Sequence, residues 1–179
     1  MFRHLKVVVM KKILLACISI AVTSAAMAGA ARSEESTFLK TLAGSWSGKG
    51  TVKVRASSPT MNVTCKFQSN TTASSIALDG RCTSLAVFSR VITADLKTNG
   101  SAYTGSYVGA GTGTAGLNGT RAGDAIKLDV KWAKEVNGDR RALLTIEKMG
   151  PSGMRLTTVD ADPATGRSIV TSQIDLRRN

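Results

Sequence analysis

Apolar and polar residues alternate one by one along most of the chain. From Trp46 to Arg55, apolar residues and glycines occupy every second position, with polar residues between them. The segments 61–68 and 76–82 repeat this pattern. Successive side chains of a β-strand point to opposite faces, so a period of two indicates strands with one buried and one exposed face.

Turn-forming residues separate these segments. Asn, Asp, Gly and Pro favour turns because they tolerate or preset the backbone angles that turns require. Short turns between successive strands predict an all-β fold, an antiparallel up-and-down meander of about eight to ten strands. Closure into a barrel removes the exposed edges of such a sheet, and a sandwich is the alternative. The turn signals are residues 72–75, Asn99-Gly100, Asn137-Gly138, Pro151-Ser152-Gly153 and residues 162–166.

The turns also predict which residues of neighbouring strands face each other. A turn at residues 72–75 places Cys65 opposite Cys82. Asn99-Gly100 predicts a two-residue type I′ loop. At Asn137-Gly138 a two-residue loop would pair an apolar residue with a charged one, so we expect three or five residues, with room for a bulge. The other expected pairs are Leu96 with Tyr103, Trp132 with Leu144 and, around a loop centred on Ala164, Met154 with Ile174.

The first 28 residues have the features of a cleaved signal peptide. Met10-Lys11-Lys12 supplies a positive start, and the apolar stretch that follows ends in the small residues Ala26-Met27-Ala28. We therefore expect the true start at Met10 and export to the periplasm, with no transmembrane segment after cleavage. The alternatives are a lipoprotein acylated at Cys17 and an uncleaved anchor.

The mature chain is expected to form one domain. Residues 29–36 are expected to be flexible, and the spacing of Phe38, Leu39 and Leu42 predicts one or two helical turns. The barrel domain then spans residues 37–179, a length that suits a single core.

Loss of the leader changes the cysteine count. It removes Cys17 and leaves Cys65 and Cys82, an even number in an oxidising compartment, which predicts a disulfide. Such a bond is worth roughly 3 kcal/mol for a loop of this size in the chain-entropy account. The alternative is two free buried thiols.

Loss of the leader also removes His4, the only histidine. Without histidine, serine–histidine and cysteine–histidine nucleophilic sites and nearly every zinc or copper site are excluded. The sequence therefore predicts a protein that is not an enzyme and carries no metal or cofactor.

The mature chain remains basic. The chain holds 24 Lys and Arg against 12 Asp and Glu, and the leader takes four of the cations, so the mature net charge is 20 minus 12, or +8. An exported basic protein favours acidic envelope material over nucleic acid as a partner. The alternative is a charge that only keeps the protein soluble.

Residues at the two ends of the barrel domain resemble a known superfamily. Gly44-Ser45-Trp46 resembles the Gly-x-Trp motif of the calycins, which include lipocalins and avidins. Those families commonly place an arginine of the last strand over the tryptophan, and parity favours Arg178 for that position. The resemblance implies a barrel with a structural pair at one end. The chain also resembles small exported bacterial proteins of unknown function and, more distantly, bacterial metalloprotease inhibitors.

A few aromatic and glycine residues are candidates for an internal site. Tyr103, Tyr107 and Trp132 could line a cavity, or pack in the core as aromatics of small barrels ordinarily do. The inward positions also hold several glycines, which leave space for a ligand or for neighbouring aromatics. These are Gly48, Gly50, Gly80 and Gly105.

Two further motifs receive structural interpretations. Residues 111–116 fit Gly-x-Gly-x-x-Gly, but no helix is expected after them, so we predict a glycine-rich strand or loop rather than a dinucleotide site. Asp160 and Asp162 lack the further ligands of a calcium loop and are expected to begin a turn.

The combined expectation is a non-enzymatic periplasmic barrel. It would bind a small apolar or amphiphilic ligand inside, or an acidic envelope component on its basic surface. The alternative is a protein-binding module, such as an inhibitor of an exported protease or an assembly partner.

Overall fold

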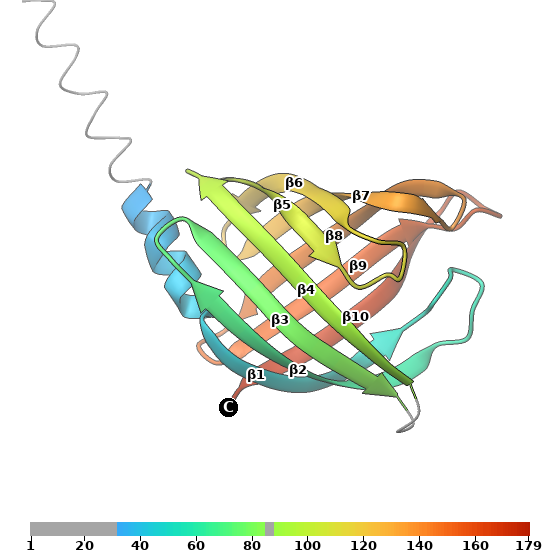
Figure 1. The fold of residues 1–179 in the computed structure, drawn as a ribbon, viewed down its shortest axis with the longest axis horizontal. Coiled ribbons are helices and arrows are strands. Elements are labelled where there is room, and N and C mark those ends of the chain that lie inside the picture. Colours follow the sequence, from blue (N-terminus) through green and yellow to red (C-terminus); the bar gives the residue numbers. More distant parts are fainter. Residues whose placement is uncertain (1–31, 85–87) are drawn as a thin grey trace, which may run out of the picture.

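The structure, a computed structural model, describes residues 32–84 and 88–179. It is a closed barrel of ten antiparallel strands with a helix at one end (Figure 1). The predicted all-β meander is confirmed. The strands are β1 (Gly44–Val52), β2 (Met61–Thr71), β3 (Ser75–Ser84), β4 (Phe88–Asn99), β5 (Ala102–Val108), β6 (Ala115–Ala122), β7 (Ala125–Val136), β8 (Asp139–Met149), β9 (Gly153–Ala161) and β10 (Ser168–Arg178).

Each strand pairs with its neighbour in sequence, and β10 pairs with β1 to close the ring. The closing register places Trp46 opposite Arg178 and Gly50 opposite Ile174. Closure pairs both edges that an open sheet would expose, so the barrel, rather than the sandwich, is the solution adopted.

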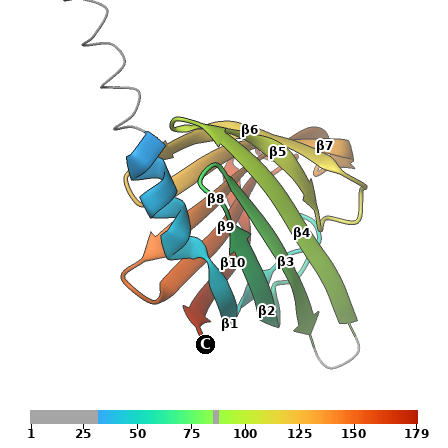
Figure 2. The same ribbon diagram turned by 60° about the vertical axis from the view of Figure 1, so that its left-hand side comes forward.

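The N-terminal helix, residues 32–42, lies across one end of the barrel, beside the turn between β2 and β3 (Figure 2). Phe38, Leu39 and Leu42 of this helix are buried, as their spacing predicts. The helix is longer than expected, because residues 32–36 are helical rather than flexible. Glu35 explains the extension, since it is buried and continues the same helical face by one turn.

The inward glycines do not open space, contrary to one of the two expectations. A Cβ atom on Gly48 would lie 1.9 Å from the carbonyl oxygen of Asp175, and one on Gly105 would lie 1.9 Å from that of Asp95. At Gly80 the ring of Phe67 occupies the position of a Cβ, at 2.1 Å. These glycines therefore let neighbouring backbones and one aromatic ring approach closely.

The turn at residues 72–75 has the predicted register. Cys65 pairs directly with Cys82, and the two form the predicted disulfide, with Cα atoms 4.1 Å apart. The amide of Thr72 donates to the carbonyl of Ser75 at 2.9 Å, which closes the turn.

The predicted loop at Asn99-Gly100 is displaced by one residue. Asn99 pairs with Ala102, so the loop is Gly100-Ser101, and Leu96 faces Gly105 instead of Tyr103. Gly100 has a φ of +60°, whereas Asn99 has none of the positive φ that a type I′ loop requires. The expected register is therefore wrong by two residues, a shift that leaves every side chain on its predicted face.

At Asn137-Gly138 the loop has two residues, and the expected odd length is wrong. Both residues have positive φ, 56° and 90°, as a type I′ turn requires. In a regular ladder, a two-residue loop would pair an apolar residue with a charged one. A bulge inside β7 avoids this pairing, because residues 132–135 lie opposite the single residue Arg140. This bulge shifts the pairing by three residues, so that Leu144 faces Leu128 and not Lys131, the partner that a two-residue loop alone would give. The predicted partner, Trp132, is therefore wrong.

A second bulge lies in β10. The register changes between Val170 and Ser172, which leaves Thr171 as the extra residue. Ile174 faces Leu156 and not the expected Met154. One residue of this displacement comes from the bulge, and the other comes from the turn, because Ser168 pairs with Ala161 and the loop is therefore not centred on Ala164. Both bulges lie near the end of the barrel that the helix does not cover.

Among the described residues, no helix has the length and apolar character needed to cross a membrane. The predicted leader, with Met10, Cys17 and His4, lies outside the described residues.

Candidate functional site

An internal cavity of about 130 Å³ lies at the end of the barrel opposite the helix. Its walls are inward-facing residues from β1 to β5 and from β7, β9 and β10, together with the loops of that end. Most of these side chains are apolar, among them Val63, Ile92 and Ile174. Val54, at the rim, is 55% exposed, so the cavity extends to the barrel mouth.

Trp132 and Tyr107 form the aromatic part of the cavity wall. Their rings meet edge to face, with centroids 5.9 Å apart and an interplanar angle of 61°. Trp132 belongs to the β7 bulge, and Arg140 Nε donates to its carbonyl at 2.8 Å, which holds the bulged backbone. Burial raises the pKa of Tyr107 to about 12, so its hydroxyl stays protonated in the neutral range.

Asp160 contributes a carboxyl group to the same cavity. Its side chain is 5% exposed, and Thr171 Oγ1 donates to Asp160 Oδ2 at 2.7 Å. The β10 bulge supplies this partner, because Thr171 is the extra residue there. Burial raises the pKa of Asp160, while the side chains of Thr171, Trp132 and Asn137 favour its charged form.

Two buried polar atoms in this cavity, Trp132 Nε1 and Asp160 Oδ1, have no partner within hydrogen-bond distance among the described residues, although the Trp132 side chain lies close enough to the Asp160 carboxyl to favour its charged form. Buried polar groups are nearly always paired, and leaving one unpaired costs about 1–3 kcal/mol. An indole N–H only donates, whereas a carboxylate oxygen only accepts. Within mainly apolar walls that also hold Lys53, Arg90 and Asn137, these two atoms are thus an unpartnered donor and an unpartnered acceptor.

The aspartate prediction was half right. Asp162 begins the expected turn, since its carboxylate accepts hydrogen bonds from the amide of Ala164 at 3.1 Å and from Thr165 Oγ1 at 2.8 Å. These bonds lower the pKa of Asp162. Asp160 is not a turn residue, because it shares the inward parity of Met154 and Leu156 on β9. That parity is the sequence signal that could have identified it.

The loops at the mouth are tied to one another and to β4. The amide of Ala56, in the loop after β1, donates to Asn137 Oδ1 at 2.8 Å. Arg90 Nη1 donates to the carbonyl of Gly109 at 2.9 Å, in the glycine-rich loop after β5. As predicted, strand β6 and not a helix follows the Gly-x-Gly-x-x-Gly segment. Among the loops of this end, those between β1 and β2 and between β5 and β6 both contribute to the cavity wall.

The predicted pair at the other end is brought together. The guanidinium carbon of Arg178 lies 4.4 Å from the centre of the Trp46 ring, and Trp46 Nε1 donates to the carbonyl of Leu42 at 3.0 Å. Arg178 also donates to the carbonyl of Ala43, at the end of the helix. Gly44 leaves room for this arginine, since a Cβ there would lie 2.7 Å from Arg178 Nη1. The arrangement joins the helix, β1 and β10.

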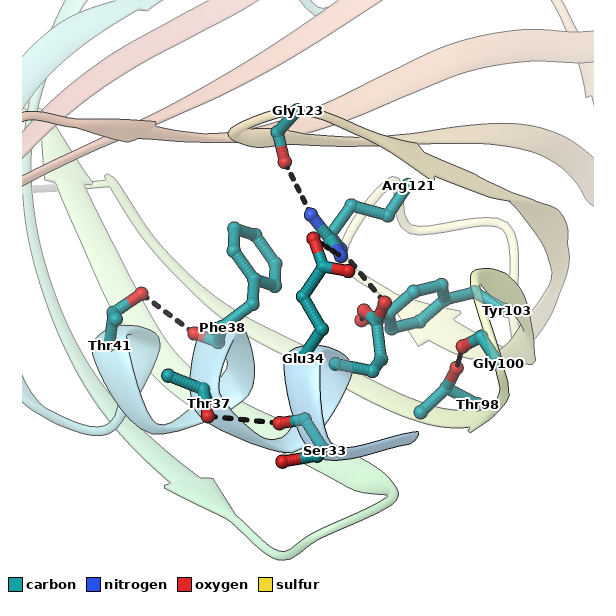
Figure 3. A network of polar contacts seen from close by, with 11 residues as sticks. Ser33, Glu34, Thr37, Phe38, Thr41, Thr98, Gly100, Tyr103, Arg121 and Gly123 are labelled. Atoms are coloured by element: carbon teal, nitrogen blue, oxygen red, sulfur yellow. Dashed lines mark hydrogen bonds and ion pairs between the residues drawn. The ribbon is translucent and has the colours of Figure 1, made fainter. Parts of the chain in front are cut away.

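Tyr103, predicted together with Tyr107 and Trp132, does not belong to the described cavity wall. It is fully buried at the helix end, where its hydroxyl donates to Glu35. Arg121 Nε donates to the same carboxylate at 2.8 Å, and the Arg121 guanidinium lies over the ring of Phe38 (Figure 3). Burial, followed by the hydrogen bond to Glu35, raises the pKa of Tyr103. This network fastens the helix to β5 and β6.

Within residues 32–84 and 88–179, no group of three or more His, Cys, Asp or Glu side chains could hold a metal ion. The Cys82 half of the disulfide contributes to the cavity wall, and Cys65 is fully buried.

Comparison with known proteins identifies a shared fold. No protein-family model matches the sequence, and no curated protein matches it. The crystal structure of Rv2717c from M. tuberculosis is similar, with a TM-score of 0.61 and 15% sequence identity over 79% of this chain and 94% of that chain. At this identity the likeness shows the ten-stranded antiparallel barrel alone.

Proposed function

We propose that this protein is a non-enzymatic periplasmic barrel of the calycin type that binds a small, mainly apolar molecule in its interior cavity. The observation that carries this proposal is the pair of unpartnered polar atoms, Trp132 Nε1 and Asp160 Oδ1, in a mostly apolar cavity. Ligand pockets combine apolar walls with a few polar groups that orient the ligand. Without a ligand to pair with them, the burial of these two atoms would lower the stability of the folded protein.

The size of the cavity limits the ligand. A volume of about 130 Å³ is close to that of an engineered apolar cavity of about 150 Å³ that accepts benzene. Ligand pockets for drug-sized molecules are larger, about 300–1,000 Å³. The part of the ligand inside the cavity is therefore compact, about the size of one six-membered ring.

Native mass spectrometry of protein purified from its own cells tests this proposal. We expect a co-purifying small molecule, or saturable binding of ring-sized probes such as benzene by the ligand-free protein. Trp132→Ala and Ile174→Ala enlarge the cavity and should change the size of the probe that binds best. Failure of all ring-sized probes to bind the folded protein would rule the proposal out.

A second candidate function is supported by the outer surface. The cross-strand row Arg177, Ser47, Lys66 and Arg81 spans β10 and β1–β3, and Lys66 lies directly opposite Arg81. Like charges in directly opposite positions destabilise a sheet. A bound anion would offset this repulsion, so we propose that this row binds phosphate-bearing envelope material.

Vesicle binding tests the second candidate. We expect binding to vesicles with anionic phospholipid that weakens as salt is raised, and no binding to phosphatidylcholine vesicles. Lys66→Gln with Arg81→Gln should abolish it, whereas Lys97→Gln with Lys127→Gln makes the same change of charge elsewhere on the outer surface and should not. Equal losses in both double variants would indicate net charge alone.

A further inference from the structure

The two unpartnered atoms of the cavity define the polar group of its ligand. We propose that the ligand carries a hydroxyl group on a compact ring, and that this hydroxyl accepts from Trp132 Nε1 and donates to Asp160 Oδ1. The inference rests on the proposed function, because it names the ligand class for that same cavity.

Trp132 and Asp160 face the same space. Both contribute to one cavity wall, and the Trp132 side chain lies near enough to favour the charged form of Asp160. Trp132 lies in the β7 bulge, and Thr171 is the extra residue of the β10 bulge. Thr171 Oγ1 donates to the other carboxylate oxygen of Asp160, Oδ2, at 2.7 Å. Bulges recur beside functional sites because they re-aim side chains. The bulges of two non-adjacent strands, β7 and β10, thus both place side chains near the Asp160 carboxyl.

Donor and acceptor chemistry selects among the possible polar groups. A hydroxyl has one donor and two lone pairs, so a single oxygen can serve both the indole and the carboxylate. An ammonium group has no acceptor for Trp132 and would meet Arg90 and Lys53 in the same wall. A carboxylate or a ketone has no donor, so it leaves Asp160 Oδ1 without a partner when that carboxyl is charged. A plain hydrocarbon leaves both protein atoms unpaired.

The apolar walls and the volume of the cavity determine the rest of the ligand, namely its apolar character and its size. The apolar side chains of Val63, Ile92 and Ile174 surround the space, and about 130 Å³ accommodates one ring. Phenol is therefore the simplest probe of the proposal, with benzene as the matched molecule that lacks the hydroxyl.

Two-dimensional NMR of the full chain provides the test. The chain holds two tryptophans, so its spectrum has two indole N–H signals, which Trp132→Phe assigns. We expect phenol to bind at least about tenfold more tightly than benzene, since a site built for a hydroxyl strongly disfavours the analogue without it. Phenol, but not benzene, should move the Trp132 signal downfield. Benzylammonium and benzoate should bind more weakly than phenol.

Variants separate the polar pair from the rest of the cavity. Trp132→Phe and Asp160→Leu should each abolish the preference for phenol while benzene still binds. Thr157→Val removes a hydroxyl from the same strand as Asp160 and should leave the preference unchanged.

The outcomes distinguish this inference from the function on which it rests. If benzene or benzoate binds as tightly as phenol, or if Trp132→Phe retains the preference, the hydroxyl assignment is wrong and the cavity still binds a ring. If none of the probes binds the folded protein, the proposed function fails together with the inference.

Discussion

The buried carboxylate of Glu35 is predicted to hold the N-terminal helix on the barrel. Its side chain is 3% exposed and accepts hydrogen bonds from Arg121, at 2.8 Å, and from Tyr103. Glu35→Ala would leave the Arg121 guanidinium beside Phe38 without its main partner, and the Tyr103 hydroxyl buried and unpaired. The change therefore removes one charge from a pair and strands two donors.

The expected cost follows from the burial of the pair. Removing one partner of a buried ion pair typically destabilises a protein by about 3–5 kcal/mol. For a domain of this size each kcal/mol lowers the melting temperature by about 2–4 °C, so we expect a fall of roughly 6–20 °C. Urea and thermal unfolding, monitored by circular dichroism, measure both quantities.

Glu34 is the matched control. It is one residue away on the same helix, its side chain is 75% exposed, and its carboxylate lies 3.6 Å from Arg121 Nη2. Exposed pairs contribute about 0–1 kcal/mol, so Glu34→Ala should change the unfolding free energy by less than about 1 kcal/mol. If Glu35→Ala and Glu34→Ala cost the same, the reasoning from burial is refuted.

A compensating variant tests whether the stranded groups cause the loss. Glu35→Leu together with Arg121→Met and Tyr103→Phe removes the acceptor and both donors at once. Replacing a buried polar network by apolar residues of similar volume is often neutral or stabilising. The triple variant should therefore be more stable than Glu35→Ala, and a lower stability would show that the network itself stabilises the fold.

Three further predictions concern the barrel wall. Burial raises the pKa of Asp160 above its unfolded value, so the stability that Asp160 contributes is complete below about pH 4 and is lost as the pH rises through the folded pKa. Asp160→Asn should flatten this pH dependence of the unfolding free energy, measured by urea unfolding at a series of pH values. Reduction of the bond between Cys65 and Cys82 should lower the unfolding free energy by about 3 kcal/mol, measured with and without reductant, and Ser at both positions should remove the effect of reductant. Gly80→Ala places a methyl group against the ring of Phe67 and should cost about 1–3 kcal/mol in thermal unfolding, with Phe67→Leu reducing that cost in a double-mutant cycle; additive effects would contradict the contact.

Alternation along the chain predicted most strands and their faces, but not where each ends: Val54, expected on the buried face, lies beyond β1 and is 55% exposed. Period two depends only on local geometry, so the Cys65–Cys82 register and the inward position of Trp132 could be read without knowledge of the rest of the barrel. The registers of residue pairs beyond a bulge could not be read from the sequence. The extra residues at 132–135 and at Thr171 carry no compositional mark, and each displaces every pair that follows it.

The polar groups of both barrel ends were missed for a different reason. Glu35 is a common type of helix residue, and its burial depends on Tyr103 and Arg121, which are 68 and 86 residues away. Asp160 stands beside a turn signal, and that signal outweighed its inward parity. Trp132 was identified as an aromatic of the interior, but the unpaired N–H became visible only with the neighbouring strands in place.

The pairing of β1 with β10 has a consequence for the order in which the protein folds. Arg178 contacts the carbonyl of Ala43 from 135 residues away, so the first strand stays without one neighbour until the last has been synthesised. Contacts between residues so far apart in the sequence form slowly, and strand edges that are still unpaired are prone to associate with other chains. Until β10 is in place, the nine earlier strands can form only an open sheet, and the pairing of Trp46 with Arg178 closes that sheet into a barrel.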